Sequence, residues 1–512
     1  MPGIVTHKFR LHNAEQFYEA FSEATDSVMY IFVARTNAWT VDASPPTPTD
    51  TTKETNYDIW RNMIAAKRVT SSDISYCTTR TNWANNTFYA KYADNNSTLW
   101  SNNFFVVTDT YNVYKVIDNN NNANSTVKPT STSSATVKTT DGYRWKYMYT
   151  ITAADALKFL TTNYIPVKTL SANDGSSQWT VQQAAANGAL EYVDLTANGT
   201  LYLQTNGTIG TVTNSSVVIL AVGANTTDNI YNGSAIYIDS GLGAAQVREV
   251  VDYNGTTRAL TVNNAFTTSP NTSSTYIVSP KVLFDGDGSG ASAYSNVSSG
   301  QVTDVTMIAQ GTNYSFGSVT ITANSSHGSG AAASVYTSQW GGHGKDPVLE
   351  LGGYNVMLNV RLTGTESNTF IVNNDFRVIG LMKDPLLESS GLEANGSVYD
   401  MTTKLTLTSI SGTYTFDEVL DGGTSSATAR VVAFANTNGA GTTGVLSVTG
   451  VNAAFTATET VTGNTSSVTA TVSSIASRGL KDYHGEVLYI ENRPPVSRAS
   501  DQIEDIKIIT KF

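Results

Sequence analysis

Two kinds of residue are scarce in this sequence: cysteines, which can form disulfides, and residues with ionised side chains. Cys77 is the only cysteine among 512 residues, so neither an intrachain disulfide nor a CxxC zinc site can form. Only 14% of the residues are Asp, Glu, Lys or Arg, against about 25% in an average soluble domain. We therefore expect a polar but mostly uncharged surface and a fold that matures without disulfides.

Basic residues and long apolar runs are also scarce. The chain has 31 Lys and Arg against 42 Asp and Glu, a formal net charge of −11. Nucleic acids and anionic membranes are bound through dense basic faces, so we expect neither as a partner. Apolar stretches such as residues 217–222 are far shorter than the ~20 residues that cross a bilayer. The first ten residues also lack an apolar run of signal-peptide length. These absences predict a soluble protein made in the cytoplasm.

Residues 1–172 read as an N-terminal α+β core domain with mixed periodicity. Asn13 and Gln16 resemble a capping box and predict a short helix. Its apolar face would be Phe17, Ala20, Phe21 and Ala24. Residues 27–34 and 144–151 predict buried strands, and Thr152 with Asp155 predicts a second helix that runs to residue 160.

Two later sections are rich in Gly, Ser, Thr and Asn and predict small inserted β-domains, at residues 173–340 and 401–476. GSGASA at 288–293 and GSGAAA at 328–333 are near-copies, as are TSSATARV at 424–431 and TSSVTATV at 465–472. We read each pair as duplicated hairpin units. Residues 341–400 return to the core, and residues 477–512 supply its C-terminal strands. The predicted fold class is mainly β with an α+β core, comprising several antiparallel sandwich-like or barrel-like domains and few short helices.

No local motif points to catalysis, a cofactor or a metal. The five histidines lack HxH or HExxH spacing. GDGSGA at 286–291 fits GxGxxA, but an alternating strand pattern follows it where a dinucleotide site needs a helix. Asp285 and Asp287 mimic the start of a calcium loop, yet Asn296 stands where a bidentate Glu belongs. Cys77 is interpreted as an inert buried hydrophobe. We therefore predict that the protein is not an enzyme and has no cofactor.

Several segments, taken in order, resemble one known family. HGEVLYIENRPPV at 484–496, followed by DQIEDIKI at 501–508, resembles the ending of the dimeric baseplate wedge subunit of T-even-type contractile-tailed bacteriophages. Further matches are KFR at 8–10, PPTPTD at 45–50, DGYRWKY at 141–147 and FR at 376–377. The signature residues are Asp141, Gly142, Tyr143, Trp145, Tyr147, Phe376, Arg377, Gly485, Glu486, Tyr489, Glu491, Asn492, Arg493, Pro494 and Pro495.

The resemblance implies a structural function. It implies a homodimer that joins neighbouring wedge proteins in the virion baseplate of a contractile tail, after synthesis and assembly in the host cytoplasm. The main alternative is a receptor-binding adhesin, because the polar β-sections are similar to modules of tail fibres. Glycan binding by these sections has no particular residue in its favour. A polysaccharide-degrading enzyme is a third hypothesis, and it would need carboxylates that converge only in the fold.

The residues of the C-terminal signature also have a physical interpretation. Proline cannot donate to a β-ladder, so we predict a strand at 486–492 that ends at Pro494 and Pro495. Glu491 and Arg493 would form a structural pair. Ile503, Ile506, Ile508 and Ile509 predict a closing strand that returns to the sheet begun by the first region.

Overall fold

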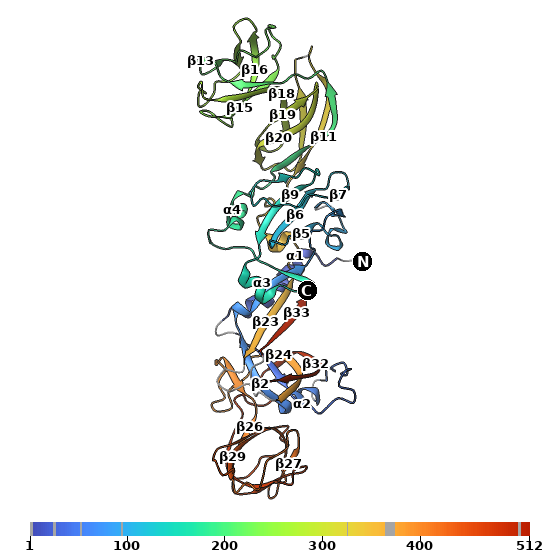
Figure 1. The fold of residues 1–512 in the computed structure, drawn as a ribbon, viewed down its shortest axis with the longest axis vertical. Coiled ribbons are helices and arrows are strands. Elements are labelled where there is room, and N and C mark those ends of the chain that lie inside the picture. The colour runs from blue at the N-terminus through green and yellow to red at the C-terminus, as the bar shows by residue number, and fades with distance from the viewer. Residues whose placement is uncertain are drawn as a thin grey trace. The chain divides into compact units, whose positions relative to one another are not determined.

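The computed structural model describes residues 4–23, 27–51, 54–93, 96–324, 326–363, 374–499 and 503–512. It contains 46% strand and 9% helix, which confirms the mainly β, multi-domain fold class (Figure 1). Two compact units divide the chain. Unit 1 is Met1–Arg80, Thr152–Lys168 and Leu351–Phe512, and unit 2 is Thr81–Ile151 and Thr169–Glu350. Residues 81–151 thus belong with later residues rather than with the rest of 1–172, because α4 (Ser177–Ala184) places Val181 in their core.

Unit 1 is built on two antiparallel sheets. The five-stranded sheet contains, in spatial order, β25 (Val398–Asp400), β2 (Met63–Val69), β1 (Met29–Ala34), β24 (Asn374–Lys383) and β32 (Glu486–Arg498). The four-stranded sheet contains β10 (Tyr164–Val167), β3 (Ile74–Thr79), β23 (Asn355–Thr363) and β33 (Ile503–Lys511). Strand β1 is central in its sheet, so its apolar run MYIFVA is buried on both faces. One face, with Ile31, packs with residues of the second sheet, while the other, with Phe32, packs against Trp60.

The C-terminal strands close this core. Strand β32 pairs with β24, the neighbour of β1, and β33 pairs with β23, the neighbour of β3. Ile506 and Ile508 lie in the cluster between the sheets. The predicted return of the chain to the sheet of the first region is therefore confirmed. Residues 501–502 of the signature lie outside the described residues.

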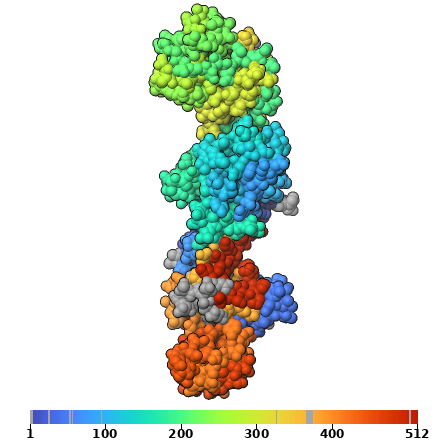
Figure 2. Space-filling model, in the orientation of Figure 1, coloured from blue at the N-terminus to red at the C-terminus, as the bar shows by residue number. Residues whose placement is uncertain are grey.

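A closed six-stranded barrel follows β25 in unit 1. Its strands, in order around the barrel, are β26 (Thr403–Thr408), β29 (Thr443–Thr449), β28 (Thr428–Asn436), β27 (Val419–Gly422), β30 (Thr460–Gly463) and β31 (Thr469–Ala476). Hairpins β27–β28 and β30–β31 pair in the same register 41 residues apart, Leu420 with Ala429 and Val461 with Ala470. The predicted duplication is confirmed here. Figure 2 shows the barrel as a rounded orange surface beside the red surface of the C-terminal strands.

Unit 2 contains one small aromatic-rich sheet and a larger β-module. The first sheet is β5 (Phe105–Val107), β6 (Asn112–Asp118), β9 (Arg144–Thr150) and β8 (Val137–Lys138), with a separate pair β4 (Thr87–Phe88) and β7 (Asn124–Ser125). The module contains β12 (Thr205–Thr208), β18 (Thr275–Gly286), β15 (Ser234–Ser240), β16 (Val247–Asn254), β17 (Ala259–Val262), β14 (Val217–Ile219), β13 (Thr211–Asn214) and β21 (Gly317–Thr322). Its other pairs are β11 (Leu190–Thr200) with β22 (Ser329–Thr337) and β19 (Ser289–Ser298) with β20 (Gln301–Thr312).

The near-copies at 288–293 and 328–333 are not two hairpins, so that interpretation is wrong. The first copy begins β19, which forms a hairpin with β20, whereas the second begins β22, which pairs with the distant β11. What repeats is the pairing environment. A Cβ built on Gly290 would lie 3.8 Å from the Cα of Gly311, and one built on Gly330 would lie 3.8 Å from that of Gly199. The duplication therefore includes the partner strands β20 and β11, of which β11 is remote in sequence.

The helices are short. They are α1 (His7–Glu19), α2 (Glu54–Asn62), α3 (Ala153–Phe159), α4 and α5 (Pro347–Glu350), with 3-10 turns at Ser71–Asp73 and Leu99–Ser101. Thr152 caps α3 as predicted, because its hydroxyl accepts from the backbone N–H of Asp155 at 3.1 Å. Helix α1 begins earlier than predicted, since Thr6 rather than Asn13 is its N-cap. Ala24 lies outside the described residues.

Candidate functional site

The DGYxWxY segment forms the turn that leads into β9. The Asp141 carboxylate accepts hydrogen bonds from the backbone N–H groups of Thr126 and Val127 at 2.8 and 2.9 Å and from the Thr139 hydroxyl at 2.5 Å. Burial acts to raise the pKa of Asp141, but these hydrogen bonds outweigh it and hold that pKa below its ordinary value. Asp141 is therefore an ionised structural acceptor that holds two loop segments together.

The glycine and aromatic residues of this segment complete the turn. Gly142 has a φ of +87°, and a Cβ there would lie 2.6 Å from the side-chain carbon of Asn120, so only glycine fits without strain. Tyr143 and Trp145 are buried and stacked with ring centroids 5.2 Å apart. Tyr147 is buried on the same strand. These residues build a core at the motif.

Phe376 and Arg377 lie on β24 in unit 1. Phe376 is buried in the cluster between the two sheets. The guanidinium of Arg377 is also buried, and it lies 3.2 Å from Asp375 and 3.9 Å from Asp42 while donating to the backbone oxygen of Thr36 at 3.3 Å. Arg377 thus connects β24 to the loop after β1.

The GExxYxENRPP segment forms the edge strand β32. Gly485 packs closely, since a Cβ there would lie 3.0 Å from the Cα of Pro385. Glu486 pairs with Lys383 at the start of the strand. The Tyr489 hydroxyl donates to Glu491 at 2.9 Å, and burial together with this carboxylate raises the pKa of Tyr489 to about 12. Tyr489 is therefore neutral at physiological pH.

The middle of this segment anchors the proline-rich loop at residues 45–48. Glu491 and Arg493 form the expected pair at 3.1 Å. Asn492 donates to the backbone oxygen of Pro46 at 2.9 Å, and the indole of Trp39 donates to the backbone oxygen of Arg493 at 2.8 Å. The loop therefore covers part of an otherwise open sheet edge.

Pro494 and Pro495 do not end the strand, so that prediction is wrong. Strand β32 runs on to Arg498, and its register against β24 shifts between Phe376 and Val378. The two prolines lie within this shift on an edge strand, where missing N–H donors break no ladder.

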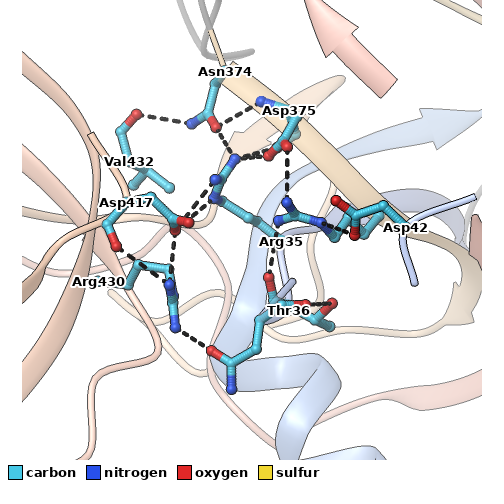
Figure 3. Close-up of polar contacts among 10 residues, drawn as sticks. Arg35, Thr36, Asp42, Asn374, Asp375, Asp417, Arg430 and Val432 are labelled. Atoms are coloured by element: carbon cyan, nitrogen blue, oxygen red, sulfur yellow. Dashed lines mark hydrogen bonds and ion pairs between the residues drawn. The ribbon is translucent and has the colours of Figure 1, made fainter. Parts of the chain in front are cut away.

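A polar junction attaches the barrel to the five-stranded sheet (Figure 3). Arg35, at the end of β1, is only 1% exposed. Its guanidinium donates to Asn374 at 2.6 Å, pairs with the Asp375 carboxylate, and lies 3.2 Å from Asp417 of the barrel. It also lies 4.3 Å above the ring of Phe416. One buried cation thus contacts strands of the sheet and a loop of the barrel.

Further contacts extend this junction. Asp417 accepts from Arg430 at 2.8 Å, and the Asn374 amide donates to the backbone oxygen of Val432 at 2.8 Å. Burial acts to raise the pKa of Asp417, but Arg430 and Arg35 outweigh it and lower that pKa. Figure 3 shows Asp417 between these two guanidinium groups. Thr449, the cross-strand neighbour of Arg430, donates to the backbone oxygen of Arg61 at 2.8 Å.

Two buried glutamates that sequence reasoning missed join the halves of the barrel. Glu418 accepts from the backbone N–H groups of Thr465 and Ser466 at 3.0 and 2.8 Å, in the second hairpin. Glu459 accepts from those of Thr424 and Ser425 at 3.1 and 3.0 Å, in the first. The signal was present, because TxxE at 415–418 and at 456–459 repeats with the same 41-residue spacing as the TSS copies.

The structure does not bring the sequence-predicted residues into one site. Asp141, Gly142, Tyr143, Trp145 and Tyr147 belong to unit 2, whereas the remaining signature residues belong to unit 1. Cys77 is fully buried, and burial raises the pKa of its thiol to about 12. Among the residues that the structure describes, no group of three or more His, Cys, Asp or Glu side chains could hold a metal ion. None of the helices in the described ranges is long and apolar enough to span a bilayer.

Comparison with known proteins adds one finding. The chain matches the model of the phage family described as Bacteriophage T4, Gp8, over residues 3–118 and 424–512. No curated protein matches the chain. The matched ranges contain β1–β3, strand β28, the second barrel hairpin β30–β31 and the GExxYxENRPP strand. They exclude β27 and residues 141–147 and 376–377.

Proposed function

Because this chain is a structural subunit of the baseplate wedge, of the Gp8 type, we propose that it acts as a homodimer that joins neighbouring wedge proteins. The family places it in the virion, in the tail baseplate of a contractile-tailed phage, and implies contacts with other baseplate proteins. An isologous dimer uses one self-complementary patch on both subunits and leaves the remaining surface for these partners.

The family match to both the N-terminal and the C-terminal parts of the chain carries this proposal. Those parts include β1 and β32, two strands of the same sheet. The signature residues described above support an architectural role, since they make turns, cores and loop anchors. We propose that they preserve the fold and perform no chemistry, and that the protein is not an enzyme.

The polar junction supports a mechanical role. A structural subunit in a contracting tail has to transmit force between its domains without unfolding. Arg35 and Asp417 form a charged contact from one domain to another, and Arg35 is fully desolvated. Removing a carboxylate partner of a buried cation such as Arg35 is costly because it leaves the charge less compensated. The junction therefore favours a fixed orientation of the barrel on the sheet.

We further propose that residues 173–340 and 401–476 are excursions from the predicted core of residues 1–172, 341–400 and 477–512, of which residues 81–151 and 341–350 fold with unit 2. The topology is consistent with this for the barrel. Strand β24 precedes the barrel in the sequence and β32 follows it, and these two strands pair with each other. The module of unit 2 would add outward surface for neighbouring baseplate parts.

Molar mass in solution tests the homodimer. Full-length protein is passed over a size-exclusion column with light-scattering detection across a tenfold concentration range. The expected mass is twice 54.7 kDa and independent of concentration. A stable trimer would contradict the proposal and favour a fibre-like adhesin, and a monomer throughout the range would also contradict it. Co-assembly with other baseplate proteins then tests the joining role.

A further inference from the structure

Strand β33 forms one edge of the four-stranded sheet in unit 1 (Figure 1). It pairs with β23 over the whole of Ile503–Lys511, without a register shift. Alternate N–H and C=O groups of an edge strand face away from its neighbour. For β33, the described part of the chain supplies no backbone hydrogen-bond partner to these outward groups. The strand therefore presents a row of open donors and acceptors.

The other three edges of the two sheets in unit 1 are short or interrupted. Strand β25 has three residues, and β10 has four, with Pro166 among them. Strand β32 contains Pro494 and Pro495, has two register shifts and anchors the proline-rich loop. Short length, proline and bulges are the devices that protect open edges from further pairing. Strand β33 has nine residues and none of these devices, so of the four edges it is the most open to another strand.

The side chains of β33 restrict which strand fits that edge. Ile506 lies in the core between the sheets, and side chains alternate along a strand, so the odd-numbered residues lie on the opposite face. This face carries Asp505 and Lys507, which are opposite in charge, and Ile503, which is 58% exposed. Hydrogen bonds from Arg361, with Lys507 nearby, lower the pKa of Asp505, so its carboxylate is ionised. The outward face thus carries one negative and one positive charge, two residues apart.

A second copy of β33 matches this pattern when it runs antiparallel about a two-fold axis at Ile506. Directly opposed residues of an antiparallel pair share a face and interact. This register places each Asp505 opposite Lys507 of the second copy. It also places each exposed Ile503 opposite Ile509, so both the charged and the apolar side chains gain suitable partners. An axis at Asp505 or at Lys507 would instead oppose like charges, which is destabilising.

We propose that β33 pairs with β33 of a second copy in this register, so that the two four-stranded sheets join into one continuous sheet. This inference rests on the proposed homodimer and names its interface. Charge complementarity favours a second copy over an unrelated strand, because the Asp505–Lys507 pattern matches itself when the strand is reversed. The family match also contains the whole of β33.

Charge reversal tests the interface, with the molar mass of full-length protein measured by light scattering. Lys507→Glu opposes two carboxylates at each of the two symmetric contacts, and Asp505→Lys opposes two ammonium groups. Each variant alone is expected to dimerise about tenfold more weakly than the wild type, or worse. An equimolar mixture restores both ion pairs, so it should regain the dimer mass. Lys345→Glu makes the same charge change at an exposed residue of unit 2 and should leave the dimer unchanged.

The outcomes separate this interface from the homodimer itself. Wild-type affinity in both variants would overturn the β33 interface and leave the homodimer standing, whereas a monomeric wild type would contradict the homodimer. Loss of the dimer in both variants, each still folded by circular dichroism, without recovery in the mixture would also overturn the interface.

Hydrogen exchange gives a second measurement that needs only Lys507→Glu. It is required because Asp505 accepts from Arg361 at 2.8 Å in its own sheet, so replacement of Asp505 can disturb the fold. Peptides that cover residues 503–511 should exchange about tenfold faster in Lys507→Glu than in the wild-type dimer, because their outward N–H groups lose their partners. Peptides that cover β10, at the other edge of the sheet, should not change. Equal exchange of residues 503–511 in the two proteins would overturn the proposal.

Discussion

Replacement of Glu418 by Gln is expected to open one turn of the barrel and leave its copy closed. The Glu418 carboxylate accepts four hydrogen bonds, from the N–H groups of Thr415, Thr465 and Ser466 and from the Ser466 hydroxyl, at 2.5, 3.0, 2.8 and 2.9 Å. One oxygen takes both bonds from the N–H groups of Thr465 and Ser466. Glutamine keeps a single acceptor oxygen, and its NH₂ group cannot accept.

The expected magnitude follows from these contacts. Two of the four bonds are lost in either orientation of the amide, and hydrogen bonds to charged groups contribute about 1.5–3 kcal/mol each. Thr465 is exposed, so water can reach the freed N–H groups and the lower end of the range applies. The contacts of residue 418 with Thr415 and with the turn at 465–466 should together lose about 3 kcal/mol of local stability. This corresponds to a loss of amide protection of up to roughly 100-fold.

Hydrogen exchange followed by mass spectrometry measures this effect. In Glu418→Gln, peptides that cover residues 463–469 should exchange faster, while those that cover 422–428 should change much less. Glu459→Gln should give the reverse pattern, because it caps the other hairpin. Glu15→Gln on the exposed face of α1 serves as the control. Equal loss in both turns for either variant, or no loss, would refute the crossed-cap reasoning.

Three further outcomes are expected. Burial acts to raise the pKa values of Glu418 and Glu459, but hydrogen bonds lower both below 4.5 in the folded protein. The stability that the two ionised carboxylates contribute is therefore present above that pH and is lost as pH falls through their folded pKa values. The melting temperature should fall between neutral and acid pH, and it should fall less in the variant with both glutamates replaced by Gln. Arg35→Met leaves Asp417 without one of its two cations, so limited proteolysis should cut the variant faster than the wild type at the barrel attachment. Faster cleavage of the wild type would contradict the role given to the junction. Gly142→Ala should destabilise its sheet by about 1–3 kcal/mol, because a residue with a Cβ is strained at the positive φ of this position. Urea denaturation followed by tryptophan fluorescence measures this, and an unchanged midpoint would contradict it.

Local patterns were sufficient to predict several elements. The apolar pattern at 27–34 predicted the buried strand β1, and the Thr152 cap predicted α3, because each depends on residues that are close in sequence. The 41-residue repeat likewise predicted the paired hairpins of the barrel. The mainly β fold class followed from the same short alternating patterns.

The contacts that organise the candidate site were beyond local reasoning. Arg35 meets Asp417 across 382 residues, and Glu418 meets Ser466 across 48. Neither contact could be predicted from the spacing of residues along the chain, because the position of a charged residue in the sequence does not specify which residue it contacts. The strand through Pro494 was missed because proline is tolerated only at an edge or a bulge, and both properties depend on the position of β24. The partner of β22 was missed because it comes from β11, far earlier in the chain.

The pairing of β1 has a consequence for how the protein is made. Met29 pairs with Lys383, about 350 residues later, and β24 in turn pairs with β32. A ribosome adds about 5–20 residues each second, so β1 waits roughly 20–70 s before its neighbour emerges. During that interval β1 can pair with β2 on one edge, but its other edge stays unsatisfied and makes this apolar strand a target for chaperones. The core of unit 1 can therefore form only late in translation, and a partially synthesised chain has no finished sheet to offer a growing baseplate.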